Sequence, residues 1–388
     1  MKKISILIFI ITFFSTLAFA QKPQLILGIA KEEKSIDYYD QQFDLWTKEA
    51  KKDPSNGLAW RQRYLAKRAF LQKQSLQTWL NQPQIVFSKL DKVIEESKTH
   101  IGESFEYYFM KAMNSKGKKA IDYSLKAHKI DPDRDEVYGW IFGFSVIDGD
   151  DTLASDMGKR MMKSNAYSNA NLLWNLNGLQ TAEPNSIFIA NGDLDCGPKW
   201  LLQYANNIRR DVLVISKWSL DQDDAYRSRI FKEVGIPQPD KTRNDFSAPV
   251  EYIDYLTVTL LKNGKRNAYM QCGTDINLFK RYDIENKMYL VGNAFVYSDR
   301  RFDNYKVLRD NLKKYRLEYL LDDFQSHPEL SLIKTDIHLT YLPALNSAIK
   351  YYADNGQDEM ESYYADVMNV ILEESGREKE LRELYKNN

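Results

Sequence analysis

Apolar residues in the first third of the chain recur every three or four positions, which is the spacing of one face of an α-helix. Between residues 36 and 50, the positions on that face are Ile36, Tyr39, Phe43, Trp46 and Ala50. The pattern predicts a helix that stops at Asp53, because the residue before a proline is disfavoured in helical backbone. Similar spacing predicts helices over residues 58–73 and 83–98.

Short apolar runs of strand-forming residues replace this spacing in the middle of the chain. Four segments are predicted strands, the first two of them buried on both faces of a sheet: residues 187–190, 212–215, 268–272 and 288–296. Helices are predicted between them, from Pro198 onward and over residues 222–234, 249–261 and 275–282. This order is typical of a small, mainly parallel, Rossmann-like α/β sheet, in which right-handed crossovers place the loops after the strands at one edge.

The C-terminal part returns to helical spacing. Residues 341–355 and 358–375 have the pattern of a helix–turn–helix, and a last short helix is predicted to end at Tyr385. The chain is therefore expected to combine all-α and α/β parts. The expected divisions are a signal peptide (1–20), a helical domain (21–184), an α/β domain (185–300) and a C-terminal helical repeat-like region (301–388).

The first residues have the pattern of a secretory signal peptide. Lys2 and Lys3 precede an apolar run over residues 4–14, and the Ala-Phe-Ala sequence at residues 18–20 suits a cleavage site. The alternative is an uncleaved membrane anchor, which is disfavoured because a bilayer span needs ~20 apolar residues. Charged residues interrupt every later apolar run. We therefore expect cleavage after Ala20 and a periplasmic, secreted or cell-surface-associated protein with no membrane span.

The charge and composition of the chain argue against several classes of partner and cofactor. The chain has 54 basic and 54 acidic residues with no basic block, so nucleic acid is not an expected partner. Its four histidines lack metal-ligand spacing and no glycine-rich phosphate loop is present, so no metal or cofactor is expected. The 25 Tyr, 18 Phe and 7 Trp residues indicate helix packing or, alternatively, an aromatic platform for sugars.

Acidic and amide residues gather where the predicted strands end. Asn191, Asp193, Asp195 and Lys199 follow the first strand, and Asp275 follows the third. Because these loops share one edge of the sheet, all five are candidate ligand-binding residues. Asp193 and Asp195 have the Asp-x-Asp spacing that can hold a divalent cation or a sugar hydroxyl. The alternative is that they cap the following helix by accepting backbone N–H bonds, and Asp275 has the same alternative at its own helix.

The two cysteines, Cys196 and Cys272, are predicted at the same edge. In an exported protein an even number of cysteines suggests a disulfide, which needs Cα atoms within about 7 Å. Neighbouring strands can supply that distance. The sequence leaves two alternatives, a bridge between these cysteines and two buried thiols.

Residues 117–133, GKKAIDYSLKAHKIDPD, carry the small residues Ala120 and Ala127, followed by Pro132. Small residues let paired helices approach closely, and the proline ends the second helix of the pair. This spacing resembles the tetratricopeptide repeat. The match covers at most two units, with Tyr108 where a small residue is usual, and an irregular helical bundle is the alternative.

The loop after the first predicted strand carries a second resemblance. Residues 192–196 read Gly-Asp-Leu-Asp-Cys, Trp200 lies in the next helix, and residues 209–212 read Arg-Arg-Asp-Val. Together with the later NAYMQC and MYLVGNAFVY, they resemble the soluble C-terminal region of bacterial protein O-mannosyltransferase-like membrane proteins. Leu194 and Cys196 replace polar residues of that family's loop. The resemblance implies a fold with helical repeats, whereas transferase chemistry is associated with a membrane part that the resemblance does not include.

Two hypotheses follow. The first is an exported, non-catalytic binding or assembly protein of the bacterial cell envelope, whose helical repeats form a surface for protein partners. The second is an enzyme acting on glycans or sugar phosphates through Asp193 or Asp195, and a glycan is also a candidate ligand under the first. The first is favoured because small residues suit helix pairing and the histidine and glycine patterns of common enzyme sites are missing.

Overall fold

The computed structural model of the 388-residue chain describes residues 22–27, 29, 33–273, 275–321, 337–379 and 382, and for Leu80, Asn81 and Asp193 the backbone alone. The expected signal peptide and the predicted helix end at Tyr385 lie outside the described residues. The described part is mostly helical with one small mixed sheet, and its two compact units divide between Asn114 and Ser115. Each helix in this part is too short or too polar to span a bilayer.

The first unit is a set of packed helices: α2 (Ile36–Lys52), α3 (Gly57–Gln74), α4 (Leu76–Asn81), α5 (Pro83–Ile101) and α6 (Phe105–Met113). Ser35 and Asn56 cap α2 and α3 with their side-chain oxygens, which explains where these helices begin. α3 packs against α2, α5 and α6. The three helices predicted in this region are confirmed, with ends that differ by at most three residues.

The two units divide between residues 114 and 115, whereas the sequence predicts a domain boundary between residues 184 and 185. Four helices that precede it belong to the second unit: α7 (Gly117–Ile130), α8 (Tyr138–Asp148), α9 (Asp151–Lys163) and α10 (Asn169–Thr181). The reason is packing, because α9 and α10 contact α11 (Asp193–Asn206) and α8 contacts α13 (Asp224–Val234). Helical spacing alone does not show which core a helix joins.

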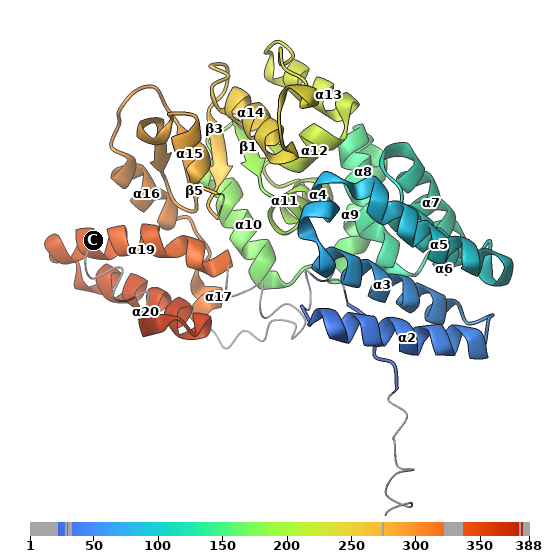
Figure 1. The fold of residues 1–388 in the computed structure, drawn as a ribbon. Coiled ribbons are helices and arrows are strands. Elements are labelled where there is room, and N and C mark those ends of the chain that lie inside the picture. Colours follow the sequence, from blue (N-terminus) through green and yellow to red (C-terminus); the bar gives the residue numbers. More distant parts are fainter. Residues whose placement is uncertain are drawn as a thin grey trace, which may run out of the picture. The chain divides into compact units, whose positions relative to one another are not determined.

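The second unit is built around a five-stranded sheet. Its strands are β1 (Ile187–Ala190), β2 (Leu213–Ser216), β3 (Ala268–Gln271), β4 (Met288–Leu290) and β5 (Ala294–Tyr297), in the spatial order β2-β1-β3-β5-β4. β2, β1 and β3 are parallel, β5 is antiparallel to β3, and β4 is antiparallel to β5. Figure 1 shows β1, β3 and β5 in the middle of this unit. The first three predicted strands are confirmed.

The single strand predicted over residues 288–296 is wrong, because the segment is a hairpin of β4 and β5. The chain turns at Gly292, whose φ of 137° lies in a region that favours glycine. A Cβ at this position would also collide with the hydroxyl of Tyr315. The sheet is therefore mixed rather than mainly parallel.

Different helices cover the two faces of the sheet. On one face, Ile189 of β1 and Met270 of β3 share a buried cluster with side chains of α13 and α14 (Pro249–Leu261). On the other face, the rings of Phe188 and Tyr269 stack with centroids 6.3 Å apart. This second face is the one that α11 covers, since Lys199 of α11 lies over the Phe188 ring.

The C-terminal helices of the second unit are α16 (Asn304–Leu312), α17 (Glu318–Leu321), α19 (Leu342–Asp354) and α20 (Asp358–Ser375). α19 and α20 pack together and confirm the predicted helix–turn–helix. Their buried cluster includes Trp174 of α10. Because α10 also contacts α11, it connects the sheet layer to the C-terminal helices.

Candidate functional site

The parallel strands have a reversal of strand order at β1. The chain leaves β1 for β2 on one side, and it returns to β3 on the other side of β1. In open α/β sheets, ligands bind outside the carboxyl ends of the strands at such a reversal. Asn191 follows β1, Lys217 follows β2 and Cys272 follows β3, so this carboxyl edge is the candidate site.

Asp195 is the third residue of α11, and its carboxylate caps that helix. Its two oxygens accept the backbone N–H groups of Asn191 and Gly192, each at 2.6 Å. The residue is only 6 % exposed. Both oxygens therefore satisfy the backbone of the loop between β1 and α11, which is the capping alternative for this residue. The side chain of Asp193, the other half of the Asp-x-Asp pair, lies outside the described part of the structure.

The predicted helix start at Pro198 is wrong, since α11 begins five residues earlier and contains this proline. Proline has no N–H to donate to the carbonyl of Leu194, the residue four positions before it. The structure replaces the missing bond with two others, because Nδ2 of Asn171 and Nδ2 of Asn175 each donate to that carbonyl at 3.0 Å. Two buried amides of α10 thus make Pro198 acceptable inside α11.

Lys199 lies in the interior, with 0 % of its surface exposed. Its Nζ donates to Oδ1 of Asn175 and Oε1 of Gln271, both at 2.7 Å, and to the carbonyl of Asp195 at 3.1 Å. Burial lowers the pKa of Lys199 to about 8, and the nearby Asp195 carboxylate acts in the opposite direction. Because its three donors are used, the lysine connects α10, α11 and β3 rather than facing an external ligand.

The space for Lys199 exists because residue 178 is glycine. A Cβ on Gly178 would lie 3.1 Å from Cε of Lys199 and 3.2 Å from Oε1 of Gln271, closer than side chains ordinarily pack. Gln271 continues the network, since its Nε2 donates to the carbonyl of Asn293 at 2.8 Å. Asn293 in turn donates from Nδ2 to the carbonyl of Trp174 at 3.2 Å. Buried polar groups therefore join the sheet to α10 through side-chain hydrogen bonds.

Cys196 and Cys272 are both buried thiols in the structure, with no disulfide between them. The sequence left two alternatives, a disulfide and two buried thiols, and the structure has the two thiols. Burial raises the pKa of the Cys272 thiol well above its ordinary value. Since the thiolate is the reactive form, this cysteine is poorly suited to nucleophilic chemistry.

Four charged residues form what we call the charged rim of the carboxyl edge: Lys217, Asp254, Asp275 and Arg281. Arg281, the last residue of α15 (Asn277–Arg281), pairs with Asp254 at 2.6 Å and with Asp275 at 3.2 Å. Burial lowers the pKa of Lys217, and the charges of Asp254 and Asp275 oppose that effect. Burial raises the pKa of Asp254 despite its bond to Arg281. The rim therefore places a cation and a carboxylate with oppositely shifted pKa values near one another.

Asp275 is the residue of this rim that was predicted from the sequence, and the other three were missed. Lys217 had a usable signal, because it comes two residues after the predicted strand 212–215 and so had to lie at the same edge as Asn191. Asp254 is a charged residue among the mostly apolar buried residues of α14, which is a second usable signal. Within the described residues, no three His, Cys, Asp or Glu side chains gather closely enough to hold a metal ion.

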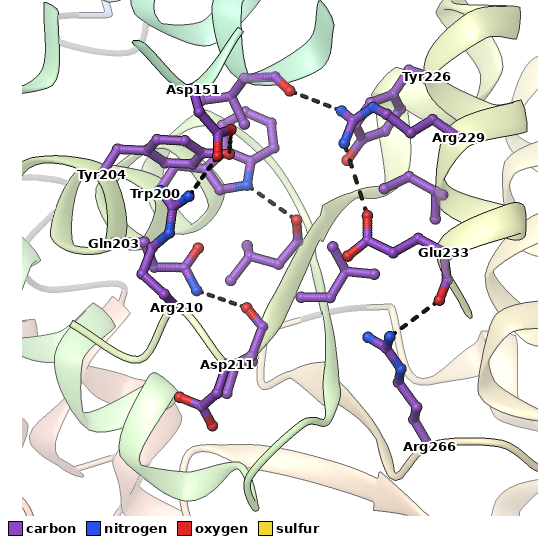
Figure 2. A pocket seen from close by; sticks show the side chains of 15 residues that line it. Asp151, Trp200, Gln203, Tyr204, Arg210, Asp211, Tyr226, Arg229, Glu233 and Arg266 are labelled. Atoms are coloured by element: carbon purple, nitrogen blue, oxygen red, sulfur yellow. Dashed lines mark hydrogen bonds and ion pairs between the residues drawn. The ribbon is translucent and has the colours of Figure 1, made fainter. Parts of the chain in front are cut away.

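A cavity of about 210 Å³ lies away from this edge, beside β2 (Figure 2). Its polar side chains contact one another or the backbone: Arg210 pairs with Asp151 at 2.8 Å, Tyr204 donates to Asp151 at 3.1 Å, and Gln203 donates to the carbonyl of Val212 at 2.7 Å. None of the five predicted site residues lines it. The cavity therefore adds no ligand groups to the candidate site.

No family model matches the chain, and no curated protein matches it. The resemblance to the O-mannosyltransferase-like region therefore stays a prediction based on the residues that carry it.

Proposed function

We propose that the chain is a non-catalytic binding or assembly protein of the bacterial cell envelope, in which paired helices bind a protein partner. The observation that carries this proposal is that two charged side chains of the predicted site stabilise the fold itself. The carboxylate of Asp195 holds the backbone of its own loop, and Lys199 is enclosed by three acceptors. These two groups position secondary structure, which leaves the helix pairs as the larger surface for binding.

Contacts between α7 and α8 support a tetratricopeptide-like arrangement in the second unit. Ala120 and Ala127 of α7 are both 0 % exposed, as expected of small residues where two helices pack closely. The hydroxyl of Tyr138 in α8 donates to the carbonyl of Pro132 at 2.7 Å and fixes the turn between the helices. A Rossmann-like relationship of the parallel strands β2, β1 and β3 belongs to the same proposal. The location in the envelope depends on the signal-peptide pattern of residues 1–20.

Capture from envelope extracts tests this function. We expect the affinity-tagged chain to recover a protein partner in near-stoichiometric amount, measured by quantitative mass spectrometry. A tagged helical protein of similar size and net charge is the control. Recovery of the same proteins by both baits, together with a monomeric chain in size-exclusion chromatography of the mixture, would contradict the proposal.

A second candidate is an enzyme acting on glycans or sugar phosphates at the charged rim. The observation that favours it is that Lys217 and Asp254 lie at the same rim and that burial shifts their pKa values in opposite directions, as in many acid–base sites. Lys217 and Arg281 would supply the cations for a phosphate group.

Glucose 1-phosphate is a suitable probe for the second candidate. An enzyme of this kind should show a raised melting temperature with the probe and should release inorganic phosphate. Both effects should disappear in Lys217→Met and persist in Lys280→Met, because Lys280 is an exposed lysine next to Arg281. Equal responses in the two variants, or none in the parent chain, would exclude the rim as a sugar-phosphate site.

A further inference from the structure

α3 of the first unit has an unusual charge composition. Over Gly57–Gln74 it contains five basic residues and no acidic one. Trp60, Arg63, Lys67 and Phe70 are spaced by three or four positions and therefore share one face of the helix. Phe43 of α2 lies beside this face, since both Arg63 and Lys67 contact its ring. We call these five residues the basic face.

The cations of the basic face lie over aromatic rings. Nζ of Lys67 is 4.7 Å from the centre of the Phe43 ring and 4.8 Å from that of Phe70. Cζ of Arg63 is 5.3 Å from the centre of the Phe43 ring and 5.2 Å from that of Trp60. Cation–π contacts of this kind hold long side chains in place, so the charges are positioned before any partner arrives.

The two cations differ in how their charge is balanced. Arg63 pairs with Glu96 of α5 at 2.7 Å, and its side chain is only 11 % exposed. Lys67 is partly exposed, and among the described residues its ammonium group has ring contacts and no carboxylate partner. Lys67 therefore presents a fixed positive charge between two partly buried rings, Phe43 and Phe70.

We propose that the basic face is a docking site for an acidic segment of a partner protein, with a carboxylate on Lys67 and an apolar side chain against Phe43 and Phe70. The proposal rests on the proposed binding function and names the chemistry of the partner. Charge complementarity selects this occupant, because one preorganised cation flanked by rings matches an acidic residue beside an apolar one. The backbone of a nucleic acid would need a row of several unpaired cations, whereas Arg63 of the basic face is already paired with Glu96.

The test is fluorescence anisotropy of the full chain with a labelled twelve-residue peptide of Glu, Ser and two Phe residues. The same peptide with Lys in place of Glu is the control ligand. We expect Lys67→Met, which keeps the alkyl stem over the rings, to weaken binding about tenfold and Lys67→Arg to restore it. Lys89→Met is the matched control variant, because Lys89 is an exposed lysine of α5. Circular dichroism establishes that each variant is folded.

Two results would overturn this inference: equal affinities of the Lys67→Met and Lys89→Met variants for the acidic peptide, or equal affinities of the parent chain for the acidic and basic peptides. The capture experiment separates this failure from a failure of the proposed function. A partner recovered equally by the parent chain and by Lys67→Met would leave the binding function intact and exclude the basic face. A chain that recovers no partner would refute the function itself.

Discussion

Asp195→Ala is expected to lower the free energy of unfolding by about 3 kcal/mol, because hydrogen bonds to a charged acceptor are the stronger ones in proteins. The substitution removes both acceptors of the N–H groups of Asn191 and Gly192. These groups lie in a partly buried loop, where water replaces the carboxylate incompletely. It also removes the negative charge that favours protonated Lys199. Urea denaturation followed by circular dichroism measures the effect.

Two matched variants give this prediction its controls. Asp195→Asn keeps one acceptor oxygen and should lose about half as much stability. Asp275→Ala removes an exposed carboxylate that accepts the N–H of Asn277 at 3.0 Å, and it should cost less than about 1 kcal/mol. If Asp195→Ala lowers the free energy of unfolding no more than Asp275→Ala does, the cap at the start of α11 does not stabilise the fold as expected.

The second large effect is a pH dependence that comes from Lys199. Its pKa is about 8 in the folded chain against an ordinary value of 10.5, so the unfolded chain binds more protons between these values. Stability must then rise with pH through this window and be independent of this group well below pH 8. From pH 7 to pH 9.5 the expected gain is about 2 kcal/mol.

The gain is measured as the difference in unfolding free energy between the parent chain and Lys199→Met at the two pH values. Buried tyrosines also titrate at high pH, but both proteins contain them and their contributions cancel. Lys280→Met, an exposed lysine variant, should show no such change. A constant difference between the parent chain and Lys199→Met would mean that Lys199 keeps an ordinary pKa in the folded chain.

Local sequence patterns correctly predict those helices and strands whose ends are determined by neighbouring residues. The strand over residues 187–190 and the helix over residues 249–261 match the structure at both ends. The strand is a continuous apolar segment, and the helix has a proline at its first position followed by apolar residues at helical spacing. The error over residues 288–296 has the same local origin. Gly292 is a turn signal inside an apolar run, and the apolar run by itself predicts one continuous strand.

The candidate site was predictable in its location and not in the state of its residues. Parallel topology places Asn191, Asp195 and Asp275 after strands of one sheet, as the sequence analysis expected. The burial of Lys199 depends on Asn175 and Gly178 of α10 and on Gln271 of β3, two elements far apart in the sequence. No local pattern connects these residues. No individual helix was predicted over the residues of α10. Its buried positions include several Asn residues, so the sequence shows no single apolar face.

The close approach of Gly178 to Lys199 has a consequence for the evolution of this protein. A larger residue at position 178 would crowd the side chains of Lys199 and Gln271, and a shorter residue at 199 that relieves the crowding leaves the amides of Asn175 and Gln271 without their cation. The four positions therefore form an epistatic group, in which single replacements are penalised and compensated sets are tolerated. In distant homologues these positions should covary as a set, and a lineage that has lost the lysine should carry apolar residues in place of both amides.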